Sequence, residues 1–150
     1  MESSTVFVKL KIPDNTAISA LQTLQRMGFS SLQNVERMEY YKFLISGNKK
    51  DFGKKIGSVD IICNANKHSM SYSLPPSIDA VSFLIKDDGS NEGLLHTLKE
   101  RLHITEIRNI DKGMVWTLHF ENEKSIHKKG REIVKALLMN PHYQTMELMR

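Results

Sequence analysis

Hydrophobic and polar residues alternate in two short segments that lie in different halves of the chain. The first segment is "TVFVKLKI", residues 5–12, and the second is "AVSFLIK", residues 80–86. An apolar residue at every second position is typical of a β-strand with one buried face. An offset of 75 positions aligns Val8 with Phe83, and Lys11 with Lys86. This offset is the first indication of an internal repeat.

A turn signal and then apolar residues at helical spacing follow each of these segments. The turn signals are "PDNT", residues 13–16, and "DDGS", residues 87–90. Apolar residues at i, i+3 and i+4 predict a helix with one buried face, and Gly28 is a natural stop for the first helix. The two apolar stripes are Ile18, Leu21 and Leu24 in the first half and Leu94, Leu95, Leu98 and Leu102 in the second.

The strongest sign of the repeat comes from the next pair of segments. They are "LQNVERMEYYKFLI", residues 32–45, and "IRNIDKGMVWTLHF", residues 107–120, again 75 positions apart. Similar residue types occupy most of the paired positions, although only Asn34 and Asn109 are identical. The run Asp111-Lys112-Gly113 offers a tight turn, so we predict a β-hairpin in each half. Tyr41, Phe43 and Ile45 would form the core face of the first hairpin.

A second helix and a short strand complete each half. The segments "DFGKKIGSVDIICNAN" and "SIHKKGREIVKALLMN" have helical spacing, and they end at Asn66 and Asn140. The short strands "KHSMSYSL" and "PHYQTMEL" follow them. Pro75-Pro76 cannot continue a helix and favours an extended link between the halves.

The predicted fold class is therefore α+β, with two tandem βαββαβ units. Each unit is expected to be an antiparallel sheet with two helices on one face. We assign residues 1–74 to the first repeat (the first copy), 75–78 to a linker, and 79–150 to the second repeat (the second copy). A single unit of this size has a small core and an exposed sheet, so we expect the two to pack as a pseudo-dimer.

Composition narrows the class of protein. The chain has 150 residues and a formal net charge of +4, and the surplus lies in the first half, where ten Lys/Arg face six Asp/Glu up to Pro76. Cys63 is the only cysteine, so no intrachain disulfide is possible, and its apolar neighbours indicate a core thiol. No apolar run is long enough to cross a bilayer, and "MESSTVFVKL" does not look like a signal peptide. We expect a cytoplasmic protein without a membrane partner.

A search for catalytic chemistry finds no motif. No nucleotide-binding or metalloprotease pattern occurs, and the six histidines lack the spacing of metal ligands. We therefore predict no catalytic residue, no metal and no cofactor. RNA-binding sheets share this order of elements, but Phe7 and Tyr40 do not form their aromatic run, so we expect no nucleic-acid partner.

The order of features resembles the PurS family. In the first copy the resemblance lies in Ala20-Leu21, Leu24 and Gly28-Phe29 leading to Val35. In the second copy it lies in Lys112-Gly113 and in "LLMNP", residues 137–141. Members of that family are about half this length and pair as homodimers. They are the small non-catalytic subunit of phosphoribosylformylglycinamidine synthase, an ATP- and glutamine-dependent amidoligase of purine biosynthesis.

The resemblance implies partners and contact residues. The partners would be the synthetase and glutaminase subunits, which the chain would bridge for ammonia transfer, as an internal pseudo-dimer that is free to dimerise further. The family's hairpin carries an Arg-x-Gly-Lys run, which the first copy lacks and of which the second keeps only the glycine. The implied contacts are the hairpin residues Glu36, Arg37, Met38, Glu39, Asp111, Lys112, Gly113 and Met114, and the helix-end residues Asn66, Asn140 and Pro141.

A second resemblance gives the alternative function. Residues 80–107 are similar to an ACT domain, with a strand, an acidic-glycine turn and a helix. As a tandem ACT-like regulator, the chain would bind a small amino acid through Asp87, Asp88 and Gly89. The first copy has Pro13-Asp14-Asn15 at this position, without a glycine. The alternative to ligand binding is a structural role, in which the Asp87–Ser90 turn caps the N-terminus of a helix.

Overall fold

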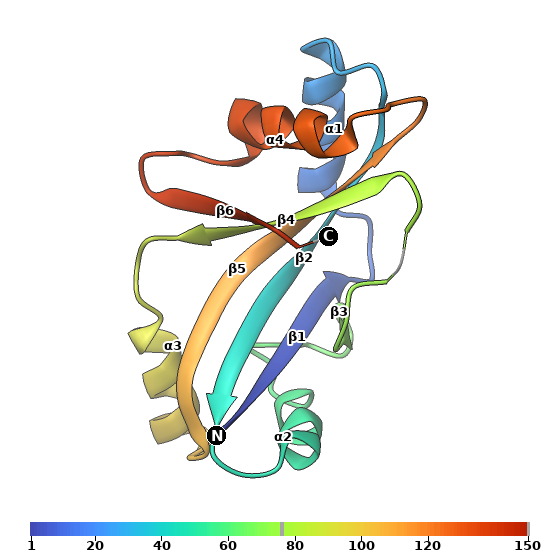
Figure 1. Ribbon diagram of the computed structural model, residues 1–150. Coiled ribbons are helices and arrows are strands. Elements are labelled where there is room, and N and C mark those ends of the chain that lie inside the picture. The colour runs from blue at the N-terminus through green and yellow to red at the C-terminus, as the bar shows by residue number, and fades with distance from the viewer. Residues whose placement is uncertain (76, 150) are drawn as a thin grey trace. The chain divides into compact units, whose positions relative to one another are not determined.

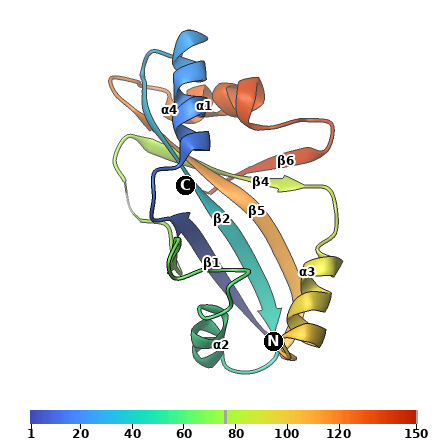
Figure 2. The same ribbon diagram turned by 180° about the vertical axis from the view of Figure 1, so that it is seen from behind.

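A computed structural model describes residues 1–75 and 77–149 and has an α+β fold (Figures 1 and 2). Six strands form an antiparallel sheet in the order β3-β1-β2-β5-β4-β6. The strands are β1 (Glu2–Leu10), β2 (Leu32–Ile45), β3 (His68–Ser71), β4 (Ala80–Asp87), β5 (Ile107–Phe120) and β6 (Gln144–Leu148). The helices are α1 (Asn15–Arg26), α2 (Lys49–Ile56), α3 (Glu92–His96) and α4 (Ile126–Ile133), and the π-helical turns η1 (Thr97–Arg101) and η2 (Val134–Leu138) extend the last two.

The chain folds into two compact units, and each is built from three separate segments. The first unit consists of Met1–Ile12, Glu39–Leu74 and Gly89–Gly113. The second unit consists of Pro13–Met38, Pro75–Asp88 and Met114–Arg150. Strands β2 and β5 are each divided, with one half in the first unit and the other half in the second. The compact units therefore do not coincide with the two sequence copies.

The core of the first unit lies between its strands and two helices. Val6 and Val8 of β1 and Phe43 of β2 face Phe52 and Ile56 of α2, and all five are almost fully buried. The second copy completes this core through α3, η1 and the start of β5. Its buried contributions are Leu98, Ile104, Ile107 and Ile110, with Leu94 and Leu95 packed at the margin.

The core of the second unit is also built from both copies, and here the first copy supplies the exchanged helix. The helix α1 of the first copy supplies Ala17, Ala20 and Leu24, which are buried against residues of the second copy. Helices α1 and α4 lie side by side in both views (Figures 1 and 2). The other buried members are Leu32, Val35, Val81, Phe83, Ile85, Trp116, Leu118, Phe120, Ile133 and Val134.

The two copies have thus exchanged their first helices. Helix α1 follows β1 in sequence but packs in the second unit, and α3 follows β4 but packs in the first unit. Each core consequently contains one helix from each copy. Hydrophobic burial, which supplies most of the stability of a domain, depends in both units on residues from both halves of the chain.

The predicted hairpins are wrong, because each is one continuous strand. Residues 32–45 and 107–120 form β2 and β5 without interruption, and Gly113 is not among the described glycines with positive φ. The reason lies in the exchange. The first half of β2 gives Leu32 and Val35 to the second core, while its second half gives Tyr41 and Phe43 to the first. A hairpin would return both halves to one core.

Two further details of the repeat need correction. Phe7 pairs with Tyr40 in the first unit, and Leu84 pairs with Val115 in the second. Tyr40 and Val115 are 75 positions apart, but Phe7 and Leu84 are 77 apart. The offset between β1 and β4 is therefore 77, although that between β2 and β5 is 75. Val8 therefore corresponds to Ile85, not to Phe83. In addition, α2 ends at Ile56 because Gly57 follows, and the segment up to Asn66 consists of turns.

The other predicted helices and short strands are present, but Ile18 and Leu102 of the predicted buried stripes are exposed. Gly28, at φ 104°, follows α1, and β3 and β6 lie within the segments predicted as short strands. Cys63 is a buried free thiol, and burial raises its pKa although the nearby Lys11 lowers it. The division into copies 1–74 and 79–150 stays a prediction. The predicted linker, 75–78, includes residue 76, which lies outside the described residues.

Separate expression of the two copies tests the helix exchange. Residues 1–75 alone lack the Leu98 and Ile104 that fill the first core, and residues 76–150 alone lack Leu24 of the second. We expect neither fragment to unfold cooperatively by itself, and the two to associate into a folded complex when they are co-expressed. Circular dichroism and analytical ultracentrifugation would show this. A fragment that melts cooperatively as a monomer would contradict the exchange.

Candidate functional site

The residues predicted to contact partners lie on the middle of β2 and β5. Glu36, Arg37, Met38 and Met114 belong to the second unit. The other four, in the first unit, are Glu39, Asp111, Lys112 and Gly113. Lys112 is exposed, and the other seven are half-buried. The central strands therefore offer a mostly covered surface rather than a protruding hairpin.

In the second unit, Arg37 is held by two contacts. Its Nε lies 2.7 Å from Oδ2 of Asp14, and its guanidinium lies 5.9 Å from the centre of the Trp116 ring. Asp14 also caps α1, because its side chain accepts a hydrogen bond from the N–H of Ala17. Burial alone would raise the pKa of Asp14, but the bonds from Arg37 and Ala17 and the charge of Arg37 lower it below its ordinary value.

In the first unit, Lys112 and Tyr41 form the corresponding contact. The Lys112 Nζ lies 5.6 Å from the centre of the Tyr41 ring, within cation–π distance. The Tyr41 hydroxyl donates a 2.9 Å hydrogen bond to Oε2 of Glu39. Burial raises the pKa of Tyr41, and the charge of Glu39 and this hydrogen bond raise it further. Tyr41 is consequently a fixed, neutral donor at physiological pH.

These two cation–π contacts use equivalent positions, but the half of the chain that supplies the cation differs between them. Arg37 and Lys112 are 75 positions apart, as are Tyr41 and Trp116. In the second unit the cation comes from the first copy and the ring from the second, whereas in the first unit the cation comes from the second copy and the ring from the first.

A backbone contact repeats the same exchange. The N–H of Ser46 donates to the carbonyl of Glu106 in the first unit, and the N–H of Glu121 donates to the carbonyl of Ser31 in the second, each at 2.9 Å. Ser46 and Glu121 are 75 positions apart, and so are Ser31 and Glu106. The two bonds at the ends of the central strands are therefore related by the same offset as the cation–π contacts.

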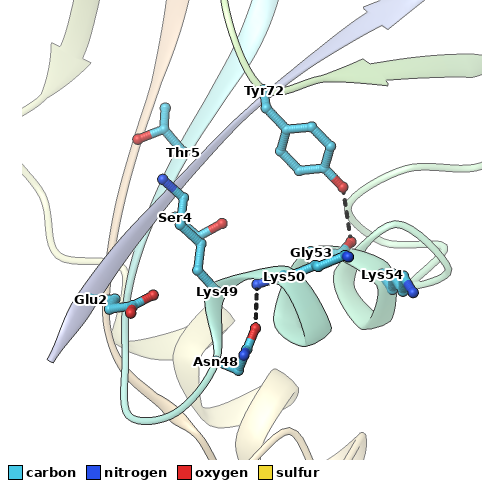
Figure 3. Close-up of a pocket in the computed structure, with 9 residues that line it drawn as sticks. All are labelled: Glu2, Ser4, Thr5, Asn48, Lys49, Lys50, Gly53, Lys54 and Tyr72. Atoms are coloured by element: carbon cyan, nitrogen blue, oxygen red, sulfur yellow. Dashed lines mark hydrogen bonds between the residues drawn. The ribbon is translucent and has the colours of Figure 1, made fainter.

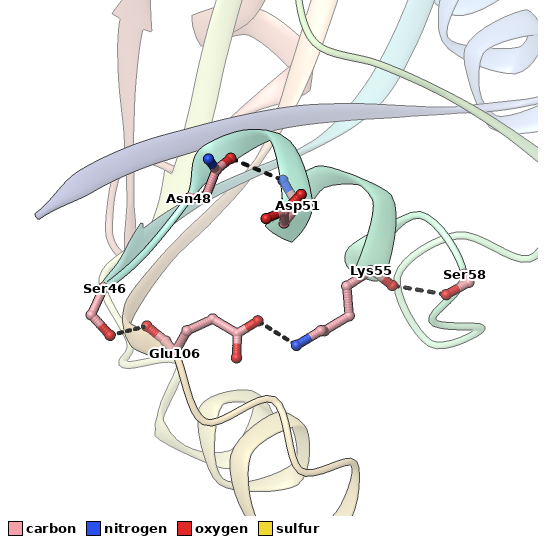
Figure 4. Close-up of polar contacts among 6 residues, drawn as sticks. All are labelled: Ser46, Asn48, Asp51, Lys55, Ser58 and Glu106. Carbon is pink, nitrogen blue, oxygen red and sulfur yellow. Dashed lines mark hydrogen bonds and ion pairs between the residues drawn. The ribbon is translucent and has the colours of Figure 1, made fainter.

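An ion pair lies beside the bond between Ser46 and Glu106 in the first unit (Figure 4). Lys55 of α2 places its Nζ 2.8 Å from Oε1 of Glu106, which directly precedes β5. Burial alone would raise the pKa of Glu106, but its bond to Lys55 and the charge of that lysine hold it below the ordinary range. A helix of the first copy is thereby tied to a strand of the second.

The predicted helix-end residues lie in turns that precede the edge strands. Asn140 accepts a hydrogen bond from the N–H of His142, and its own N–H donates to Gln144. In the first copy the same pair of bonds is made by Asn64, whose carbonyl side chain accepts from the N–H of Asn66 and whose N–H donates to His68. The counterpart of Asn140 is thus Asn64, not Asn66, and Pro141 lies in the turn after Asn140.

The turn predicted to bind an amino acid is used to hold the edge strand β6. The carboxylate of Asp87 accepts a 2.8 Å hydrogen bond from Nε2 of Gln144. The N–H of Asp88 donates to the carbonyl of Tyr143 at 2.9 Å. Gly89 is exposed, with no atom within 4 Å of an added Cβ. These contacts give Asp87 and Asp88 a structural role.

The pattern analysis missed a cavity of about 780 Å³ between β1 and α2 in the first unit (Figure 3). Three lysines, from the start and middle of α2, surround it, and the Tyr72 hydroxyl donates a 3.1 Å hydrogen bond to the carbonyl of Gly53 at one side. The lining residues are Glu2, Ser4, Thr5, Asn48, Lys49, Lys50, Gly53, Lys54 and Tyr72. The only available signal was the paired lysines of "NKKDFGKK", which equally suit a solvated helix face.

The second unit is filled at the corresponding place. An offset of 77 relates α2 to α4, and it places Gly130 at the position of Gly53. A Cβ on Gly130 would lie 2.8 Å from both Phe83 and Val81, because these side chains press against the helix. The same offset places the smaller Ser4 and Val6 of the first unit where the second unit has Val81 and Phe83. These size differences match the hollow beside α2 and the filled space beside Gly130.

Within residues 1–75 and 77–149, no three His, Cys, Asp or Glu side chains gather in a way that could hold a metal ion. No helix in these ranges is long and apolar enough to cross a membrane.

Comparison with models of known protein families and with curated proteins gives no match to this chain.

Loss of the Asp14 charge should destabilise the protein in a pH-dependent way. Asp14→Asn keeps a capping side chain but removes the ion pair with Arg37, at a cost of up to about 1 kcal/mol. Because the folded-state pKa of Asp14 is depressed, its contribution is present above the unfolded value of about 4 and is lost as the pH falls through the folded value. The urea-unfolding free energies of the two proteins should therefore converge as the pH falls further below this unfolded value. Arg37→Gln, alone and combined with Asp14→Asn, is the matched control, and fully additive losses would contradict the coupling.

The paired helix glycines should respond differently to alanine. Gly130→Ala drives a methyl group into the buried Phe83 and Val81, which should cost about 1–3 kcal/mol. Gly53→Ala meets only the Tyr72 side chain, at 3.1 Å, and that side chain is 55% exposed and able to move. The gain in helix propensity, up to about 1 kcal/mol, should leave this variant close to the wild type. Equal losses in chemical denaturation would show that the two sites are equally packed.

Proposed function

We propose that this protein is a non-catalytic assembly subunit of the PurS type, in which two tandem copies form a pseudo-dimer within one chain. In this role it bridges the synthetase and glutaminase subunits of a phosphoribosylformylglycinamidine synthase. The bridge brings the glutaminase close to the synthetase, so that ammonia released by one reaches the other. The chain contributes surfaces and spacing, and the partners contribute the chemistry.

The reciprocal cation–π pairs are the observation that carries this proposal. In a symmetric dimer, residue i of one subunit contacts residue j of the other, and j contacts i in return. Arg37 on Trp116 and Lys112 on Tyr41 follow this rule between the two copies. The paired backbone bonds at the ends of β2 and β5 follow it too. Such contacts are expected when a subunit that once paired as a homodimer is duplicated and fused.

Fusion also has a functional consequence that favours a bridging role. Once the pairing is intramolecular, it no longer depends on protein concentration, and each copy is free to change its outer surface separately. The first half carries the whole surplus of positive charge, with ten Lys/Arg against six Asp/Glu, while the rest has eleven of each. Two different outer surfaces on one chain suit two different partners.

Lys112 is the predicted contact residue of the central strands that is most accessible to a partner. It is the exposed one of the eight predicted residues on β2 and β5, and the other seven are half-buried. A partner would therefore meet the aliphatic stem and charge of Lys112 at the middle of β5. Arg37, which is held by Asp14 and Trp116, acts mainly within the fold.

Reconstitution with the two partner subunits tests the proposal. We expect the protein to co-purify with both, and glutamine-dependent amidation to fall by at least about tenfold without it, which corresponds to about 1.4 kcal/mol. Amidation from free ammonia should not change, because the synthetase chemistry does not use this chain. Lys112→Glu should weaken co-purification, whereas Lys128→Glu on the exposed face of α4 should not.

Failure of both subunits to associate would overturn the assembly role. A thermal-shift screen with free amino acids separates the alternative. Stabilisation by several degrees with one amino acid would indicate a ligand-binding regulator instead, since a ligand stabilises only the state that it binds.

A further inference from the structure

We infer that the cavity between β1 and α2 of the first unit binds a small phosphate ester that carries a flat ring, with its phosphate among the α2 lysines and its ring beside Tyr72. The lining of the cavity offers positive charge, a hydroxyl and an aromatic face in one place (Figure 3). A volume of about 780 Å³ lies within the range of small-molecule sites and suits a mononucleotide. The site is separate from the contacts that support the assembly role.

Ser4 provides the most direct evidence for a ligand. Its side chain is 1% exposed, and among the described residues its Oγ has no hydrogen-bond partner. Alternation along β1 turns Ser4 to the same face as Val6 and Val8, which is the face that α2 covers. A buried hydroxyl without a partner is unfavourable, whereas an apolar residue of similar size would be tolerated there. A polar ligand atom at the floor of the cavity would satisfy this group.

The lysines give the cavity its charge. Lys49, Lys50 and Lys54 line it together with one carboxylate, that of Glu2, so the lining carries a net positive charge. Figure 3 shows the Lys49 side chain extending from the start of α2 towards β1, where Ser4 and Thr5 lie. Flexible ammonium groups on one side of a cavity are suited to a phosphate, which has several acceptor oxygens.

The helix N-terminus itself is not the binding group. The side chain of Asn48 accepts hydrogen bonds from the N–H groups of Lys50, at 2.8 Å, and Asp51, at 3.2 Å. These amides are therefore engaged in capping α2. Recognition of the phosphate rests on the lysine side chains and on Ser4.

Tyr72 supplies the flat wall. Its hydroxyl is fixed on the carbonyl of Gly53, which sets the direction of the ring, while 55% of the residue stays exposed. An exposed aromatic face that is held in place can stack against a planar ring at little entropic cost. Gly53 leaves the ring its present place, since an added Cβ would lie 3.1 Å from the Tyr72 hydroxyl and displace it only slightly.

The second unit serves as an internal control for this inference. The positions of Ser4 and Val6 are taken there by Val81 and Phe83, whose side chains close on Gly130. The close contacts beside Gly130 show that this place in the fold can be filled by side chains. The first unit instead combines the hollow with an unsatisfied hydroxyl and three lysines.

Titration of the intact protein with AMP, followed by isothermal calorimetry and by NMR, tests the inference. We expect saturable one-site binding with a Kd at or below about 1 mM. Adenosine, which lacks the phosphate, and inorganic phosphate, which lacks the ring, should each bind at least about tenfold more weakly. Amide signals of β1 and α2 should shift, and those of α4 should not.

Three variants locate the site. Ser4→Val introduces the residue that the second unit has at this position, and it should weaken AMP binding at least about tenfold while the Tm stays equal or rises. Lys50→Gln combined with Lys54→Gln should weaken binding similarly. Lys128→Gln, which removes an exposed charge from α4, is the matched control and should leave the Kd unchanged.

Four outcomes would overturn the inference. They are an absence of saturable AMP binding, equal affinity for adenosine or for inorganic phosphate, an unchanged Kd in Ser4→Val, and an equal loss in Lys128→Gln. Because Ser4→Val should fold at least as well as the wild type, its loss of binding cannot come from unfolding.

Discussion

Burial of apolar side chains between strands and helices within each unit is the interaction on which the rest of this structure depends. Neither copy covers its strands with its own helices alone, because α1 packs in the second unit and α3 in the first. The long strands β2 and β5 are a direct result, since each must deliver apolar residues to two separate cores. The exchange of helices therefore explains why β2 and β5 are long continuous strands.

The shared architecture leaves room for the two units to differ. In the second unit Phe83 and Val81 fill the space beside the glycine of the helix, and the packing is complete. In the first unit smaller residues leave a hollow, and lysines gather at its rim. Both units keep the reciprocal contacts of the central strands. The contacts of the central strands are thus kept in both units, although the packing beside α2 differs from that beside α4.

The sequence predicted local structure well and the connections between elements poorly. The alternation of Val6 and Val8 identified β1, and the position of Gly28 identified the end of α1, because both signals act over a few residues. The assignment of α1 to the second core has no local signal, since Leu24 would be equally apolar in either core. The hairpin prediction failed for the same reason: Lys112-Gly113 suits a turn, but burial on both sides of it favours a straight strand.

Ser4 illustrates why the cavity could not be predicted. A serine within an alternating strand suits a solvent-exposed position as well as a buried one, and only the structure shows that its hydroxyl is enclosed and unpaired. The lysines of α2 gave an equally ambiguous signal, since charges on a helix usually face water. The contrast with Val81 emerges only after the register of β1 and β4 corrects the alignment.

The exchange of helices also determines when the protein can fold during synthesis. The first core needs Leu98 and Ile104, so the N-terminal half leaves the ribosome with an apolar sheet that has no complete cover. At translation rates of about 5–20 residues per second, the N-terminal half waits roughly 4–15 s for the second copy. Contacts between distant residues also slow folding, because long loops must close first. The first unit can therefore be completed only after residues up to Gly113 have been made, and the second only after the segment Met114–Arg150. Until then the strands of the first copy stay without their full cover.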